Sequence, residues 1–197
     1  MSLAHAILGF LGRGPTTGYD LKTRWLDGPA SHFWTADQAQ VYRTLDRLER
    51  EGVVVSEIVE QRGRPDRIVY SITPSGRESM LDWLVEPHHP PPVRDPFLMQ
   101  LFFSSDLSDE DVLEILVSAR STLQERLDAL RDRKTEEGSR IQPSPERERD
   151  AALSGMTLDA SIATTRAMVD WLDDCIERVQ RGLPGRPRRS VHQHSKR

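Results

Sequence analysis

One stretch restricts the fold of this chain more than any other: a helical pattern over residues 35–52 runs straight into two β-rich runs. The runs cover residues 53–61 and 67–73, and Arg-Gly-Arg-Pro-Asp between them is typical of a turn. In the second run apolar and polar side chains alternate, as in a half-buried strand, with the apolar side formed by Ile68, Tyr70 and Ile72. A helix followed by a two-stranded hairpin is therefore predicted here.

The helix over residues 35–52 has a predicted start, a buried stripe and a predicted end. Thr35 and Gln38 form a capping-box pattern with Thr35 as the N-cap residue, and Gly52 stands where a helix C-terminus favours glycine. The i, i+4, i+7 spacing predicts one buried stripe, formed by Val41, Leu45 and Leu48. The opposite face carries Ala36, Ala39, Arg43, Asp46 and Arg50, with Gln40 and Arg47 beside it. Small residues near the start of this face suit a helix whose backbone approaches a partner closely.

Two further helices are predicted before this one. Residues 3–11 are almost wholly apolar and end before Gly14-Pro15, which predicts a buried first helix. A capping-box pattern at Thr17–Asp20 opens a second helix that ends near Leu26. Three helices and a two-stranded hairpin in this order make a winged helix-turn-helix. In that fold the third helix enters the DNA major groove and the hairpin lies against the flanking backbone or minor groove.

The third helix and the hairpin turn thus form the candidate DNA-binding surface. The candidate contacts are Thr35, Gln38, Ala39, Gln40, Tyr42 and Arg43 on the helix, and Arg62, Arg64 and Arg67 around the turn. By helical geometry Gln40 and Arg43 are better placed for base edges than Tyr42, whose hydroxyl is placed to reach a phosphate. The alternative is that these arginines are solvated surface charges, as an isolated Arg-x-Arg would be.

Several linked blocks of this chain resemble the PadR family of bacterial transcriptional regulators, named for repressors of phenolic acid decarboxylase genes. The blocks are residues 3–11, 14–21, 33–34, 40–52 and 63–73, extended by 94–98 and 101–103. The resemblance implies a homodimer on an inverted-repeat operator, with Tyr42 and its neighbours at the DNA. It also implies an extended C-terminal effector and dimerisation domain. The chain departs from the family at His5, where members often carry an aromatic residue, and at Asp37-Gln38-Ala39, which replaces a small polar run.

Net charge divides the chain. The total charge of −4 seems to argue against a nucleic-acid partner, but the charge is unevenly distributed along the sequence. Residues 1–86 carry −2, residues 94–181 carry −7 and residues 182–197 carry +5. We therefore predict a DNA-binding domain over 1–86, a stiff Pro-rich linker over 87–93 and an α-helical domain over 94–181. The remaining residues, 182–197, are predicted to be a disordered basic tail. The whole chain is expected to be mainly α.

Residues 94–181 are predicted to form helices that dimerise. Asp95-Pro96, like Thr73-Pro74 before it, supplies an N-cap followed by proline, and Ser108 and Ser144-Pro145 open two long helices. Their apolar positions are Val112, Ile115, Leu116, Ala119, Leu123, Leu127 and Leu130 in one, and Ala160, Ala163, Ala167, Leu172, Ile176 and Val179 in the other. Two such stripes exceed what one winged helix covers, so a partner subunit is expected. The alternative is that the two helices pack only on each other.

Aromatic and methionine side chains near the linker are candidates for an effector pocket: Trp83, Phe97, Met99, Phe102, Phe103 and Trp171. The expected ligand is aromatic or another flat apolar molecule, although ordinary core packing is the simpler reading of each residue. Cys175 lies on an apolar stripe, as a buried structural thiol does. The His88-His89 and His192–His194 pairs lack a carboxylate or thiolate framework, so no metal site is expected.

Other signals exclude several classes of protein. No apolar run approaches the roughly 18–20 residues of a membrane span, and no export signal opens the chain. No phosphate-binding loop or nucleophile–base arrangement stands out, so neither a cofactor nor catalysis is expected. We expect a cytoplasmic, dimeric, DNA-binding regulator, a repressor that releases DNA when a small effector binds. The alternatives are a winged-helix protein-interaction module that does not read DNA and, further off, an enzyme with a helical pocket.

Overall fold

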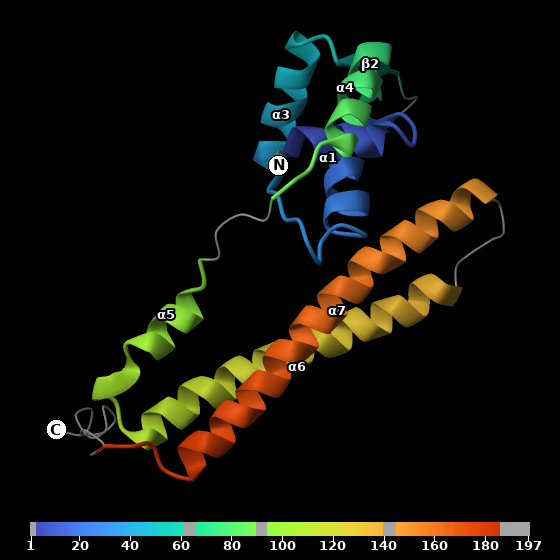
Figure 1. The fold of residues 1–197 in the computed structure, drawn as a ribbon. Helices are drawn as coiled ribbons and strands as arrows, with labels where there is room; N and C mark the ends of the chain where they lie inside the picture. Colours follow the sequence, from blue (N-terminus) through green and yellow to red (C-terminus); the bar gives the residue numbers. More distant parts are fainter. Residues whose placement is uncertain (1–2, 61–65, 90–93, 140–144, 186–197) are drawn as a thin grey trace. The chain divides into compact units, whose positions relative to one another are not determined.

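The computed structural model describes residues 3–60, 66–89, 94–139 and 145–185, which fall into two compact units, Met1–Pro91 and Pro92–Arg197 (Figure 1). Arg62 and Arg64, most of the predicted linker and the tail from residue 186 onward lie outside the described residues. Most described residues are helical, and the strands are confined to the first unit, which confirms the mainly α fold class.

The first unit is the predicted winged helix-turn-helix. Its helices are α1 (Leu3–Leu11), α2 (Gly18–Asp20), continued by a π-helical turn, η1 (Leu21–Leu26), α3 (Gln38–Arg50) and α4 (Pro74–Val85). Its strands are β1 (Thr16–Thr17), β2 (Val54–Val59) and β3 (Arg67–Ile72). They enclose one core, made of Ala4, Ile7, Leu8, Leu11, Leu21, Leu26, Val41, Leu45, Leu48, Val54 and Tyr70. The three residues of the predicted α3 stripe are all in it.

The sheet has one strand more than the predicted two-stranded wing. Its order is β1-β3-β2, with both pairs antiparallel. Thr16 pairs with Tyr70 and Thr17 with Val69, so β1 joins the start of α2 to the wing strand. A two-residue strand has no hydrophobic period of its own and therefore leaves no sequence signal.

The outer half of the wing carries apolar side chains that the core does not cover. Ile68 was predicted to lie on a buried face, but it is 50% exposed, and Ile58, its cross-strand partner, is 70% exposed. Only Val54 in β2 and Tyr70 in β3 are buried. The period-two pattern is correct, but the hairpin extends beyond the core that would cover it.

The predicted start of α3 was wrong by two residues. Asp37, not Thr35, is the N-cap residue: its carboxylate accepts from the Gln40 backbone N–H at 2.7 Å, and the Asp37 N–H donates to Gln40 Oε1 at 3.0 Å. Two capping-box patterns overlap in this sequence, Thr35–Gln38 and Asp37–Gln40. The ionised carboxylate also interacts favourably with the helix dipole, a physical reason for the second one.

The second unit contains α5 (Pro96–Phe102), a short 3-10 turn, η2 (Ser104–Asp106), and two long helices, α6 (Asp109–Ser139) and α7 (Pro145–Gln180). Asp95 caps α5 as predicted, accepting from the backbone N–H groups of Phe97 and Leu98. The long helices run antiparallel beside each other (Figure 1). Arg120 on α6 pairs with Asp173 on α7 at 2.9 Å, which links them near one end.

The apolar positions predicted for α7 lie on two faces of the helix. Ala160, Ala163 and Ala167 are exposed, whereas the buried positions of the helix are Leu158, Thr165, Val169, Leu172 and Val179. These positions, with Ile162 and Ile176 between them, follow a spacing of three and four residues. The alanines follow a second stripe of the same spacing on another face. Spacing alone cannot distinguish two parallel stripes, and the larger side chains occupy the seam with α6.

Candidate nucleic-acid interface

The outer face of α3 is polar and exposed. Ala39, Arg43, Asp46 and Arg50 point away from the core that holds the buried stripe, as predicted. Gln40 lies at the first turn, where the capping box occupies its side-chain oxygen. Its amide NH₂ group therefore remains as the donor that this residue offers to a ligand.

Arg43 carries no acidic partner among the described residues, and Arg50 on the same face donates only to the Asp46 backbone carbonyl at 3.2 Å. Arg47 is different, because it pairs with Glu51 at 3.0 Å. Arg43 and Arg47 line a hollow of about 490 Å³ beside α3, together with Leu3, Trp34, Thr35, Ala36, Gln40 and Thr44. The hollow combines cationic and hydroxyl donors with an apolar wall, a composition that suits a sugar-phosphate backbone.

Tyr42 is fixed by contact with the start of α2. Gly18 is buried there, and a Cβ atom at Gly18 would lie 2.6 Å from Tyr42 Cε1. The absence of a side chain thus lets the tyrosine ring lie against α2 while the residue stays partly exposed. Tyr42 also lies near Tyr70 of β3, whose pKa is raised, first by burial and then by nearby groups that include Asp46.

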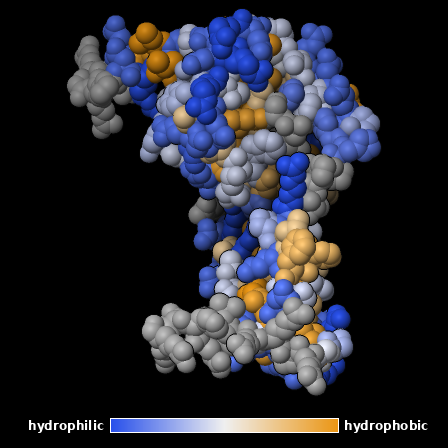
Figure 2. All heavy atoms as spheres, turned by 90° about the vertical axis from the view of Figure 1, so that its left-hand side faces the viewer, coloured by the Kyte–Doolittle hydropathy of each residue, from blue (hydrophilic) through white to orange (hydrophobic). Residues whose placement is uncertain are grey.

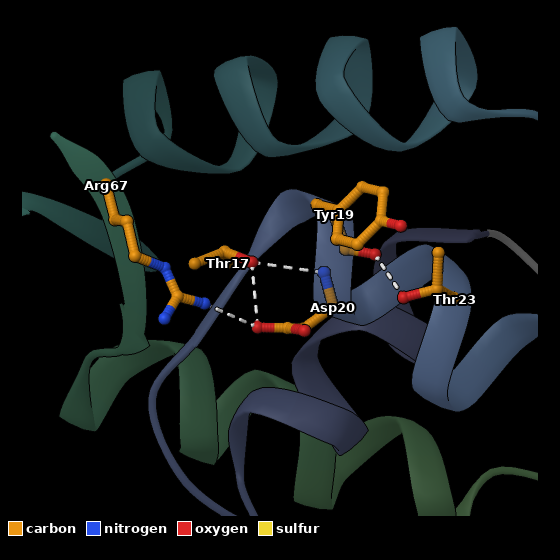
Figure 3. Close-up of polar contacts among 5 residues, drawn as sticks. All are labelled: Thr17, Tyr19, Asp20, Thr23 and Arg67. Carbon is orange, nitrogen blue, oxygen red and sulfur yellow. Dashed lines mark hydrogen bonds and ion pairs between the residues drawn. The ribbon is translucent and has the colours of Figure 1, made fainter. Parts of the chain in front are cut away.

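The wing is tied to α2 through one carboxylate, which Figure 3 shows between β3 and the first turn of α2. Arg67 Nη2 donates to Asp20 Oδ2 at 2.9 Å. The same oxygen accepts from Thr17 Oγ1 at 3.0 Å, and the Asp20 backbone N–H donates back to Thr17 Oγ1 at 3.0 Å. Tyr19, from the same turn, is exposed. Arg67 is therefore an ion-paired arginine, and not a free surface charge.

The structure thus gathers part of the predicted DNA-binding set. Gln38, Ala39, Gln40, Tyr42 and Arg43 follow one another on α3, and Thr35 lies in the loop before it. Arg67 lies at the start of β3, whereas Arg62 and Arg64 fall outside the described residues. Sequence reasoning missed Gly18, Asp20 and Asp37 as site residues. The Thr17–Asp20 capping pattern was the available signal for Asp20, but it predicted a helix start and gave no partner on the wing.

The predicted effector residues are divided among different environments. Phe97 packs edge-on against Trp171, with ring centroids 6.3 Å apart, in the core of the second unit. Met99 and Phe102 line a groove of about 750 Å³ with Arg94, Asp95, Pro96 and Leu98. Phe103 is exposed and packs edge-on against Phe102.

Trp83 belongs to the first unit. Its ring is stacked between His5 and His88, at centroid distances of 4.8 and 4.5 Å. Burial lowers the pKa of His5, because the charged imidazolium loses water.

Cys175 packs beside the core of the second unit, and burial raises the pKa of its thiol. This surrounding agrees with a structural cysteine. Within the described residues, no group of three histidine, cysteine, aspartate or glutamate side chains could hold a metal ion. None of the described helices is long and apolar enough to cross a membrane.

Hydrophobic side chains also reach the surface, where Figure 2 shows them among hydrophilic residues. In the first unit they include Leu81, Leu84 and Val85 of α4. In the second they include Leu98, Met99 and Phe102 of α5, and Leu153 and Met156 of α7. Both units therefore expose apolar surface in addition to the polar face of α3.

Comparison with known proteins assigns this architecture. Residues 7–82 match the transcriptional regulator PadR-like family, and residues 93–180 match a family described as virulence activator alpha C-term. The chain is 33% identical over 196 residues to a probable transcriptional regulator, Rv1176c, of Mycobacterium tuberculosis, covering 91% of this chain and 98% of that protein. It is also 33% identical over 132 residues to the negative transcriptional regulator PadR of Bacillus subtilis, covering 66% of this chain and 70% of that protein.

Solved structures of Bacillus subtilis PadR agree with this match. The crystal structure of that protein with operator DNA has a TM-score of 0.76 at 26% identity, covering 90% of this chain and 98% of that one. The structure with p-coumaric acid has a TM-score of 0.72 at 24% identity, covering 90% of this chain and 94% of that one. This second match supports the fold. The winged helix-turn-helix, the helical second unit and these matches agree: the chain belongs to the PadR-like family of transcriptional regulators.

Proposed function

We propose that this chain is a homodimeric repressor that binds an inverted-repeat operator through α3 and the wing, and releases it when a small apolar or aromatic effector binds. The observation that carries the proposal is the exposed face of α3, where Arg43 has no acidic partner in the described part of the chain and lies beside a hollow that Arg47 also lines. In this proposal residues 1–86 bind DNA in the cytoplasm, and no catalytic step is involved.

The acidic total charge is compatible with this function, because exposed charges act over about a Debye length, roughly 8–10 Å. Residues 94–181 of the second unit carry −7, whereas residues 1–86 carry −2. Near the start of α3, the carboxylate of Asp37 is engaged by the capping box. Local arginines then decide the attraction to phosphate, and base contacts from α3 decide the sequence.

The second stripe of α7 supports dimerisation. The seam with α6 is filled by Leu158, Val169, Leu172 and Val179, which leaves Leu153, Met156, Ala160, Ala163 and Ala167 exposed at spacings of three and four residues. An apolar stripe of this length on a helix is normally covered by another helix. A second copy of the chain would cover it and would bring two recognition helices to the two half-sites of an inverted repeat.

The groove along α5 supports the effector. Its wall is apolar at Leu98, Met99 and Phe102, and Arg94 and Asp95 also line it. A flat aromatic carboxylate has matching chemistry, with a ring for the apolar wall and an anion for Arg94. The p-coumaric acid bound by the Bacillus subtilis protein is such a molecule.

The test is an electrophoretic mobility shift with the DNA upstream of the chain's own gene, measured across a salt series. We expect Arg43→Ala to reduce discrimination at one base pair by about 1–3 kcal/mol. Arg64→Ala should weaken binding to all sequences and lower the salt slope by about one. Absence of a specific complex at moderate salt would contradict the regulator and favour the protein-interaction module. Equal losses with an unchanged slope in both variants would contradict the two roles.

A further inference from the structure

We propose that Asp20 is a positioning residue for DNA binding: it holds the guanidinium of Arg67 so that the remaining nitrogens of that group contact a DNA phosphate beside the wing. The inference rests on the proposed function, because it assumes that α3 and the wing face DNA. It adds an acidic residue to a surface for which no acidic contact was predicted.

Hydrogen bonds within its own turn hold the Asp20 carboxylate, independently of Arg67. Thr17 Oγ1 donates to Asp20 Oδ2 at 3.0 Å and accepts from the Asp20 backbone N–H at 3.0 Å, so side chain and backbone form one closed turn (Figure 3). Thr17 is itself buried and belongs to β1, which pairs with Val69 of the wing strand. The carboxylate is thereby fixed relative to the strand from which Arg67 projects.

Arg67 uses one nitrogen on Asp20 and keeps others available. Its Nη2 atom donates to Asp20 Oδ2 at 2.9 Å, while its side chain remains 47% exposed and that of Asp20 is 19% exposed. No other partner of this guanidinium is found among the described residues. A guanidinium carries five N–H donors in a planar fork, so one edge can meet a carboxylate while another meets a phosphate.

The same turn also contacts the recognition helix. Gly18, two residues before Asp20, is where the ring of Tyr42 lies against α2. The turn at Gly18–Asp20 therefore sets two things at once: the position of Tyr42 on α3 and the position of Arg67 on β3. A wing arginine that is fixed relative to α3 can meet a backbone phosphate without first losing side-chain freedom, which a free arginine would lose on binding.

This role makes a prediction of unusual sign. An acidic residue near DNA that acts only through its charge repels phosphate, so neutralising it should strengthen binding. If Asp20 instead positions Arg67, neutralising it should weaken binding, although the protein becomes more positive. The direction of the change therefore separates the positioning role from simple repulsion.

The experiment measures binding of the full chain to two probes across a salt series: a random-sequence duplex and the DNA upstream of its own gene. We expect Asp20→Asn to weaken binding to both by about fivefold to tenfold and to lower the salt slope by about one, as loss of one phosphate contact does. Asp20→Glu should restore most of the affinity, because it keeps the carboxylate. Arg67→Lys should bind weakly, because a point charge replaces the fork.

Glu78→Gln is the control. Glu78 is exposed on α4, outside the residues proposed to face DNA, so its neutralisation should leave affinity unchanged or slightly increase it. In the Arg67→Ala background, Asp20→Asn should cause no further loss, because the residue it positions is gone. Thermal melting checks that each variant is folded, and none of the substitutions removes the Thr17 hydroxyl that caps α2.

Three results would overturn the inference. If Asp20→Asn binds at least as tightly as the wild type, with an unchanged salt slope, Asp20 has no positioning role. If Asp20→Asn is not folded at the assay temperature, Arg67→Lys decides: binding equal to wild type shows that the fork is not needed. Failure of the wild type to bind either duplex would remove the proposed function and this inference with it. Normal wild-type binding with an unaffected Asp20→Asn would remove this inference alone.

Discussion

The two units of this protein solve the problem of burying apolar side chains in different ways. In the first, residues from α1, η1, α3 and the wing strands meet around one core, so each short element is covered by several others. In the second, α6 and α7 cover each other along one seam, with Val112, Leu116, Leu172 and Val179 buried near the end where α6 begins and α7 ends. The first core is surrounded by several elements, whereas the apolar seam of the second is covered by helices of the same chain on one side only.

This contrast accounts for what each unit leaves on its surface. The first unit completes its core within one chain, so the face of α3 is free to carry arginine, glutamine and small residues. The second unit leaves an apolar stripe on α7 and an apolar α5, which lack cover in the described structure of one chain. A closed core suits a domain that presents a polar site, and an open strip suits one that joins a second subunit.

The largest effect is expected from replacing one fully buried leucine in the core of the first unit and one in the α6–α7 seam of the second. Leu45 on α3 and Leu172 on α7 are both 0% exposed. We expect Leu45→Ala to lower the free energy of unfolding of its unit by about 2–5 kcal/mol. Leu172→Ala should fall toward the lower end of that range, because two helices can close over a cavity more easily than a core surrounded on all sides.

Hydrogen exchange read by mass spectrometry measures this pair, because it reports the opening of each unit separately. Leu84→Ala on exposed α4 is the control and should change stability by less than about 0.5 kcal/mol. If Leu45→Ala weakened protection in α6 and α7 as much as in α3, the two units would not be separate in stability.

A smaller effect is expected from placing a charge on the exposed second stripe of α7. Met156 is exposed on the second stripe of α7. Met156→Glu should raise the dimer dissociation constant by about 30-fold, since a buried interface side chain of this kind contributes about 2 kcal/mol. Sedimentation velocity over a concentration series measures the change. Ser121→Glu, on the exposed side of α6, is the matched control, and a monomeric wild type would contradict the proposed partner.

The smallest expected effect is a pH dependence confined to the first unit. Every histidine among the described residues lies there, and burial lowers the pKa of His5 below its ordinary value of 6.5. The neutral ring is thus favoured by folding, so its contribution is present above pH 6.5 and is lost as pH falls through the folded pKa. His5→Phe keeps a ring against Trp83 and removes this titration.

Urea unfolding at several pH values between neutral and mildly acidic measures this dependence in the first unit. The wild type should lose more unfolding free energy than His5→Phe as the pH falls. Hydrogen-exchange protection of α6 and α7 should change equally in both proteins. Parallel pH profiles for the two proteins would show that His5 is not the group responsible.

Much of the fold was accessible from local pattern. The α3 stripe of Val41, Leu45 and Leu48, the N-caps at Thr17, Thr73 and Asp95, and the order of three helices and a hairpin were all predicted and are all confirmed. Each depends on residues a few positions apart, which the helical or strand period brings together. Errors arose where two local solutions competed, as at Thr35 and Asp37, or where a strand extends beyond the core, as at Ile68.

The candidate site shows the same division. The exposed positions of α3 follow from its buried stripe, so Arg43 and its neighbours could be placed from the sequence. The Asp20–Arg67 pair could not, because its members lie 47 residues apart and meet only after β1 pairs with β3. The same holds for Tyr42 against Gly18, where the contact depends on how closely α2 and α3 approach.

The sequence by itself determined the family, the order of the elements and the polar face of the third helix, since these depend on residue type and short-range period. Only the tertiary structure decided which apolar stripe of α7 meets α6, which carboxylate holds the wing arginine, and how far the hairpin extends beyond its core. The physical reason is that packing is a competition among distant surfaces. Burial goes to the pair that fits best, and local pattern does not record which pair that is.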